Sequence, residues 1–325
     1  MIAFLILFII MCLIGTRKNS GTSMSEPLSP QNVCALRGIM AIEIVLGHTY
    51  GARNGTELLY LNDRIGIWPV GVFLFLSGYG LMYSLHHKKD YLKDFFKKRI
   101  IKRVFFPYVL VFFIRYALVY GQQNVVKVFA YDLLSNWFVT EIIIIYILWR
   151  ISYTIFNEKH ALGFLLIIIL IFNAIGCWAG ISTRWYASTA CFVLGIILEK
   201  IEPQMYLTIY KKYIIVAISI FFLVLCSVLF LCIGDNNSGI MCVCMNVTCI
   251  SVCVIVYLVL SVLSIGNEMT LFLGKNSWEI YLLHPTILYC MKNIEINNIF
   301  VWMVLYISGI SIAAWCIHQF IIGRK

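Results

Sequence analysis

The chain has 325 residues, of which 62% are hydrophobic and only 12% are charged, with a formal net charge of +10. Soluble domains are about 45–50% apolar and about 25% charged, so this composition excludes an ordinary soluble enzyme and indicates an integral membrane protein. Most of the twelve cysteines lie inside apolar runs, which is typical of packing residues rather than of metal or redox sites.

Apolar segments long enough to cross a bilayer follow one another along most of the chain. They predict an all-α, polytopic membrane protein with about ten transmembrane helices, at residues 33–50, 65–85, 104–120, 133–151, 161–178, 185–198, 213–233, 240–263, 271–290 and 299–322. The first and the sixth are short or interrupted. The chain therefore divides into an N-terminal segment with its linker, residues 1–32, and a membrane body, residues 33–325.

The first fifteen residues are apolar but short for a full crossing, and Arg17 and Lys18 follow them. They lack the basic start and the cleavage site of a signal peptide. Two interpretations stay open. The segment is an additional, marginal membrane helix, or it precedes a true start at Met24.

Lysine and arginine residues predict the orientation of the body. The connection 86–103 carries eight Lys or Arg and two Asp, which places it in the cytoplasm by the positive-inside rule. The connections 51–64, 121–132 and 234–239 are then expected on the outer side of the cell membrane. The net positive charge is explained by this orientation and does not indicate a nucleic-acid partner.

An arginine and a histidine lie eleven residues apart in the first predicted helix of the body, in LRGIMAIEIVLGH. On an α-helix Arg37 and His48 point within about 20° of each other, about 16 Å apart along the axis. Charged groups at membrane depth are costly and mark cavities or reaction paths. The alternative is a buried arginine bonded to carbonyls and a histidine that fills a packing defect.

Three further groups of polar residues stand out. The basic residues Arg99, Lys102 and Arg103 suit either anionic lipid head groups or a phosphorylated cofactor. In LGKNSWEIYLLHPTIL, polar residues at i, i+4 and i+7 share one helical face and predict a lined cavity; they are Ser277, Tyr281 and His284. Pro285 marks a bend there.

Two residues remain ambiguous on their own. Ser77 precedes Gly78 in FLFLSGYGLM, where small residues let helices approach closely. Glu141, in the fourth predicted helix, is either an interfacial group or a pairing partner for Arg37 or Arg184.

The segments LRGIMAIEIVLGH, FLFLSGYGLM, KKRIIKRVFFPY and LGKNSWEIYLLHPTIL match in order and spacing the acyltransferase-3 family of integral membrane O-acyltransferases. The chain resembles its stand-alone members. The resemblance implies transfer of an acyl group, usually acetyl, from acyl-CoA in the cytoplasm to hydroxyls of cell-surface or lipid-linked carbohydrates. Acyl-CoA would be a co-substrate, with no bound cofactor and no metal, and the partners would be the carbohydrate acceptor and membrane lipids.

The resemblance also implies roles for residues. Arg37 and His48 match the family's Arg-x10-His motif, in which both are required for activity. Arg99, Lys102 and Arg103 match its basic cytoplasmic motif, associated with CoA binding. The family usually spaces two arginines three apart, whereas here Lys102 stands three residues after Arg99 and Arg103 follows it.

The remaining candidates are expected to support the site. Tyr281 and His284 match the family's motif near the penultimate helix, and we expect Ser77, Glu141 and Ser277 to act with them.

His48 is the natural general base for acyl transfer to an alcohol, because imidazole titrates near neutral pH. A covalent acyl-imidazole remains an alternative to direct transfer. A different class of function also stays open, a transporter or flippase without acyl-transfer activity, in which Arg37, Glu43, Glu141 and His48 would line a path. The sequence does not identify the acceptor, the acyl chain or the oligomeric state.

Overall fold

The computed structural model of the protein describes residues 2–18, 27–49, 66–202, 209–233, 238–292 and 294–322. Nearly all of these residues are helical, and the two short strands β1 (Arg17–Lys18) and β2 (Leu263–Ser264) pair antiparallel. Within this part of the chain, seven helices are long and apolar enough to cross a membrane: Ile67–His87, Phe96–Tyr120, Trp137–Ile155, Glu158–Trp178, Lys211–Leu229, Gly239–Leu260 and Ile299–Ile321. The multi-pass helical architecture is therefore confirmed.

The predicted number of about ten spans is not confirmed. The helices α9 (Thr189–Ile201) and α13 (Ser277–Met291) have 13 and 15 residues, which gives lengths of only about 20–23 Å. The hydrocarbon core of a bilayer is about 30 Å thick. The N-terminal helix α1 (Ile2–Leu13) is shorter still, with 12 residues.

Two predicted boundaries are wrong. The predicted helix 271–290 is two helices, α12 (Glu268–Lys275) and α13, with a break at Asn276. The predicted loop 121–132 instead contains most of a helix, α6 (Val125–Ser135). The predicted loop 51–64, most of the loop 234–239 and the last two residues lie outside the described residues.

The chain forms two compact units. The first comprises Met1–Pro69, Phe106–Asp132 and Val259–Lys325, and the second comprises Val70–Phe105 and Leu133–Leu258. The first unit contains α1, α2 (Pro30–Thr49), α5 (Phe106–Arg115), α6, α12, α13 and α14 (Ile299–Ile322). The second contains most of α4 (Ile67–His87), then α7 (Trp137–Ile155), α8 (Glu158–Trp178), α9, α10 (Ile209–Ile233) and α11 (Ser238–Leu260).

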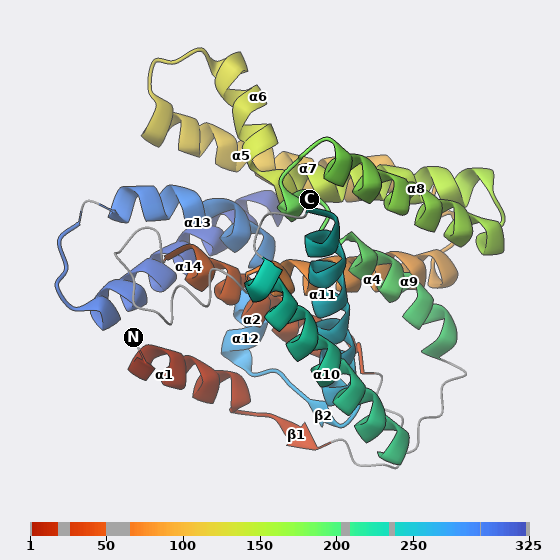
Figure 1. Cartoon of the computed structure of the whole chain (residues 1–325). Helices are drawn as coiled ribbons and strands as arrows, with labels where there is room; N and C mark the ends of the chain where they lie inside the picture. The colour runs from red at the N-terminus through yellow and green to blue at the C-terminus, as the bar shows by residue number, and fades with distance from the viewer. Residues whose placement is uncertain are drawn as a thin grey trace. The chain divides into compact units, whose positions relative to one another are not determined.

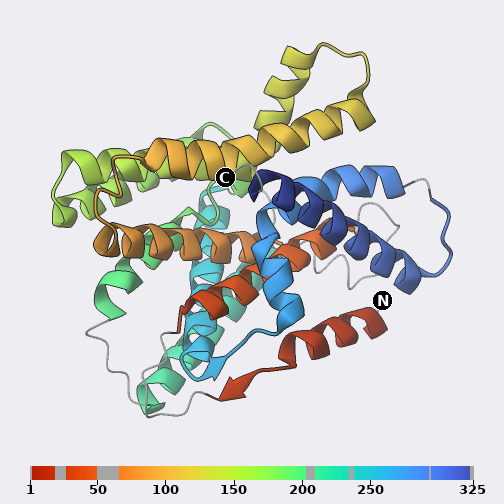
Figure 2. The same ribbon diagram turned by 180° about the vertical axis from the view of Figure 1, so that it is seen from behind.

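In the first unit, α12 packs so closely against α2 that their backbones are in contact (Figures 1 and 2). A Cβ atom on Gly274 would lie 1.8 Å from the carbonyl oxygen of Cys34, and one on Gly38 would lie 2.5 Å from that of Thr270. Only glycine permits this approach at either position. The two glycines thus determine where α2 lies relative to the helices that follow α12.

In the second unit, glycines have the same effect between α4 and α9. A Cβ atom on Gly78 would lie 2.0 Å from the carbonyl oxygen of Phe192, and one on Gly195 would lie 2.1 Å from that of Phe75. Gly78 of the SGYG sequence in α4 is therefore accounted for by close helix packing, whereas a Cβ atom on Gly80 would meet nothing within 4 Å. Helices α7 and α8 also pack against each other in this unit (Figure 2).

Candidate active site

The first unit brings two histidines together from distant parts of the sequence. The rings of His48, at the end of α2, and His284, in α13, stack with centroids 4.8 Å apart and an interplanar angle of 27°. His48 is exposed, whereas His284 is only 3% exposed. The arrangement presents one accessible imidazole supported by the face of a buried one.

The proline that follows His284 determines how this buried ring is held. Pro285 has no amide hydrogen, so it cannot donate to the carbonyl of Tyr281 four residues earlier. Nδ1 of His284 lies 2.5 Å from that carbonyl oxygen. Because a carbonyl only accepts, Nδ1 carries the hydrogen, and Nε2 is the unprotonated nitrogen of the neutral ring.

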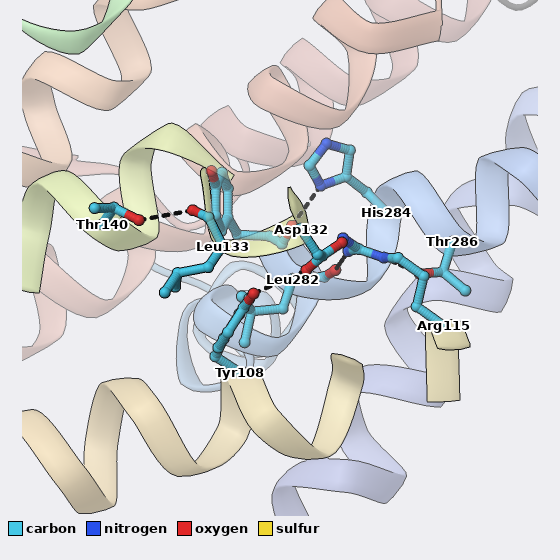
Figure 3. Close-up of polar contacts among 9 residues, drawn as sticks. Tyr108, Arg115, Asp132, Leu133, Thr140, Leu282, His284 and Thr286 are labelled. Carbon is cyan, nitrogen blue, oxygen red and sulfur yellow. Dashed lines mark hydrogen bonds and ion pairs between the residues drawn. The ribbon is translucent and has the colours of Figure 1, made fainter. Parts of the chain in front are cut away.

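A buried ion pair contacts the same turn of α13 through Arg115 (Figure 3). Nη1 of Arg115 donates to Oδ1 of Asp132 at 2.6 Å, and the hydroxyl of Tyr108 donates to Oδ2 of Asp132 at 2.9 Å. The guanidinium also donates from Nη2 to the carbonyl of Leu282 at 2.8 Å and from Nε to Oγ1 of Thr286 at 3.0 Å. Arg115 and Asp132 are 8% and 1% exposed.

Arg37 and His48 lie on one uninterrupted helix, α2. The helical geometry on which their predicted spacing depends is therefore present, and the two residues are three turns apart. Arg37 is half-buried. The other residues predicted near this site follow in α13: Ser277 is its first residue and is buried, and the ring of Tyr281 lies 5.6 Å from that of His284.

The second unit contains the other predicted site residues, Ser77, Arg99, Lys102, Arg103 and Glu141. Ser77 is buried in α4 beside the glycine that contacts α9. Glu141 is 1% exposed, and neither of its carboxyl oxygens has a hydrogen-bond partner among the described residues. Of the two open interpretations of Glu141, a pairing with Arg37 or Arg184 is therefore not observed among the described residues.

The basic residues lie on η2 (Phe96–Phe105), a ten-residue π-helix. π-helical turns are rare and are frequently found at functional sites. Arg99 and Arg103 are close enough for their charges to repel, and Nε of Arg99 is buried without an acceptor in the described part of the chain. Two adjacent guanidinium groups without a carboxylate partner favour binding of an anion.

One lysine of η2 already has an acidic partner, which lies just before the helix. Nζ of Lys98 lies 2.7 Å from Oδ2 of Asp94, and the hydrogen bond and charge of Lys98 lower the pKa of this exposed carboxyl group. Arg99, Lys102 and Arg103, in contrast, form no ion pair among the described residues. These three residues are thus cations that remain available to a ligand, together with the exposed Lys97 of the same helix.

Sequence reasoning missed Arg115, Asp132 and Thr286. Arg115 stands alone in the apolar run VLVFFIRYALV, which is the same signal that singled out Arg37. Of the described residues, no group of three or more His, Cys, Asp or Glu side chains could hold a metal ion.

Comparison with known proteins gives one family. Residues 32–322 match the acyltransferase-3 family model, which is described as an acyltransferase domain. No curated protein and no solved structure matches the chain.

Proposed function

The chain belongs to the acyltransferase-3 family, since nearly its whole length matches that family, and we propose that it moves an acetyl group from acetyl-CoA to a hydroxyl of a cell-surface or lipid-linked carbohydrate. Membership of the family establishes a membrane acyltransferase. The donor, the acceptor and the acetyl group are the proposed part. The observation that carries the proposal is the stack of an exposed His48 on a buried His284.

In the proposed reaction His48 is the general base. It takes the proton from the acceptor hydroxyl while the oxygen attacks the thioester carbonyl. The carbon–oxygen bond forms, the carbon–sulfur bond breaks, and the leaving thiolate takes the proton from the imidazolium to give free CoA. An exposed ring can reach the hydroxyl, and its stacking partner restricts the orientation of the ring. Arg37, three turns away on α2, would orient the donor.

We assign binding of the donor's phosphates to Arg99, Lys102 and Arg103. Guanidinium groups bind phosphate through paired, charge-assisted hydrogen bonds. The support for this assignment is the proximity of Arg99 to Arg103 and the absence of an ion pair for either among the described residues. The exposed Lys102 would add a third positive charge.

The test is release of free thiol from acetyl-CoA by the purified protein, with water or an added oligosaccharide as acceptor. The His48→Ala variant should release none beyond the rate without protein and should keep the thermal stability of the wild type. His160→Ala is the matched control, because His160 is an exposed histidine on another helix and should not alter the rate. Wild-type release by His48→Ala would exclude His48 as the base. An inactive wild type that moves a labelled glycolipid between leaflets would instead favour a flippase.

A further inference from the structure

One side chain, that of Arg115, forms hydrogen bonds with α13 both before and after Pro285, in the turn that carries His284. Arg115 bonds the carbonyl of Leu282, three residues before the proline, and the hydroxyl of Thr286, immediately after it. A proline inside a helix weakens this turn, because one backbone hydrogen bond is lost. The carbonyl of Tyr281, which Pro285 leaves without its helical donor, is bonded by Nδ1 of His284, and the guanidinium adds two further side-chain bonds to the same turn.

The charge of Arg115 is itself balanced within the first unit. Asp132 accepts from the guanidinium and from the hydroxyl of Tyr108 through its two different oxygens. Each oxygen of this buried carboxylate thus has a donor, as a buried charge requires. A second helix also contacts this turn: the hydroxyl of Tyr306 in α14 donates to the carbonyl of His284 at 3.1 Å. Side chains from two helices thus hold the turn.

The position of this turn matters for the charge that develops during the reaction. When His48 takes a proton it becomes an imidazolium, and the ring stacked against it is that of His284. A neutral aromatic face stabilises a cation above it, whereas a second positive charge would repel it. The hydrogen bond from Nδ1 to Tyr281 holds His284 in one orientation and one tautomer for this purpose.

We propose that Arg115, neutralised by Asp132, is a positioning residue for acyl transfer: it holds the turn around Pro285 so that neutral His284 lies face to face with His48. This inference rests on the proposed function of His48. In this proposal the ion pair of Arg115 and Asp132 affects catalysis through the position of His284 and not through a contact with the acyl donor or acceptor.

The main test replaces the whole polar group by apolar side chains of similar size. Removing one partner would leave a buried charge alone and would destabilise the protein, whereas replacing a complete buried ion pair is often neutral for stability. The triple variant Arg115→Met, Asp132→Leu, Tyr108→Phe should therefore keep the melting temperature of the wild type. Its kcat for thiol release from acetyl-CoA should fall about 10- to 100-fold, with an unchanged KM for acetyl-CoA.

A milder variant keeps the proposal testable if the triple variant does not fold. Thr286→Val removes one bond from Arg115 with little change of shape, and it should lower kcat several-fold without altering KM. Thr286→Ser, which restores the hydroxyl, should recover most of that loss. Thr248→Val is the matched control, a buried threonine in the second unit, and should have wild-type kcat.

The outcomes separate this inference from the proposed function. If His48→Ala is inactive but the triple variant and Thr286→Val both keep wild-type kcat, Arg115 is a structural residue only and the inference is wrong. A fall in kcat that tracks a fall in melting temperature in both variants would also overturn it. If His48→Ala is fully active, the proposed function fails first.

Discussion

The contact between α2 and α12 allows a quantitative prediction for Gly274→Ala. The new Cβ atom would lie 1.8 Å from the carbonyl oxygen of Cys34 and 2.6 Å from its carbonyl carbon. Non-bonded carbon and oxygen atoms need about 3.5 Å, so the two helices must separate by about 1.5–2 Å. The obstacle is backbone, which cannot change rotamer.

Overpacking of a buried contact typically costs about 1–3 kcal/mol, and a clash with backbone belongs at the upper end of this range. The separation also shifts His48 on α2 relative to His284 on α13, which directly follows α12. A displacement of about 1 Å can lower a rate about 100-fold. Gly274→Ala should therefore lower both the melting temperature and the kcat for thiol release.

Thermal unfolding of the detergent-purified protein and the thiol assay measure the two effects. Gly309→Ala is the matched control, because a Cβ atom on this residue of α14 meets nothing within 4 Å. Alanine is favoured over glycine inside a helix by up to about 1 kcal/mol, so the control should be as stable as the wild type or slightly more stable. If Gly274→Ala behaves like Gly309→Ala, the close approach of α2 to α12 is not a determinant of the site.

Two further predictions concern the acyl donor and the orientation. Replacing both Arg99 and Arg103 by Gln should raise the KM for acetyl-CoA, because each lost charge-assisted bond is worth about 1.5–3 kcal/mol, or about 10- to 150-fold. Lys159→Gln, an exposed lysine elsewhere, is the control, and an unchanged KM in the double variant would leave the cluster as a lipid anchor. In a background without the twelve cysteines, a cysteine in loop 51–64 should react with an impermeant thiol reagent on intact cells, and one in segment 86–103 only after permeabilisation. The reverse pattern would place the His48 end of α2 in the cytoplasm.

Composition and local pattern were sufficient for the class of the protein. An apolar fraction of 62% leaves little alternative to a multi-pass helical protein. The first helix of the body, predicted at residues 33–50 as short or interrupted, is the continuous helix α2, Pro30–Thr49. Helical periodicity is a local property, so it could also place Ser277, Tyr281 and His284 on one helix. The motifs that identify the family are equally local.

The contacts that organise the candidate site are not local, and the sequence could not supply them. His48 and His284 are distant in the chain, and no local pattern in either segment predicts that the two rings are in contact. The bonding of Arg115 to Asp132 depends on how α5, α6 and α13 pack. The break at Asn276 is an exception: it lies in Gly-Lys-Asn-Ser, residues 274–277, a local stop and start signal that the prediction of a single helix overlooked.

Glu141 shows a different limit on what the sequence can predict about a buried charged residue. From the sequence, this carboxyl group is either an interfacial group or a pairing partner for Arg37 or Arg184. In the structure it is buried, with no hydrogen bond to either oxygen among the described residues. Protonation would remove only the cost of the buried charge, since a neutral carboxyl group without a hydrogen bond is still costly to bury. No sequence pattern distinguishes a paired carboxyl group from an unpaired one.

The N-terminal helix has a consequence for biogenesis. The side-chain amide of Asn267 donates to the carbonyls of Met11 and Ile14, at 2.6 and 2.9 Å, and Arg17–Lys18 pairs with Leu263–Ser264. The acceptor at Met11 and the donor at Asn267 are 256 residues apart. Ribosomes add about 5–20 residues per second, so α1 leaves the ribosome on the order of 10–50 s before its docking partner exists. The helix α1 is therefore made long before the segment against which it packs.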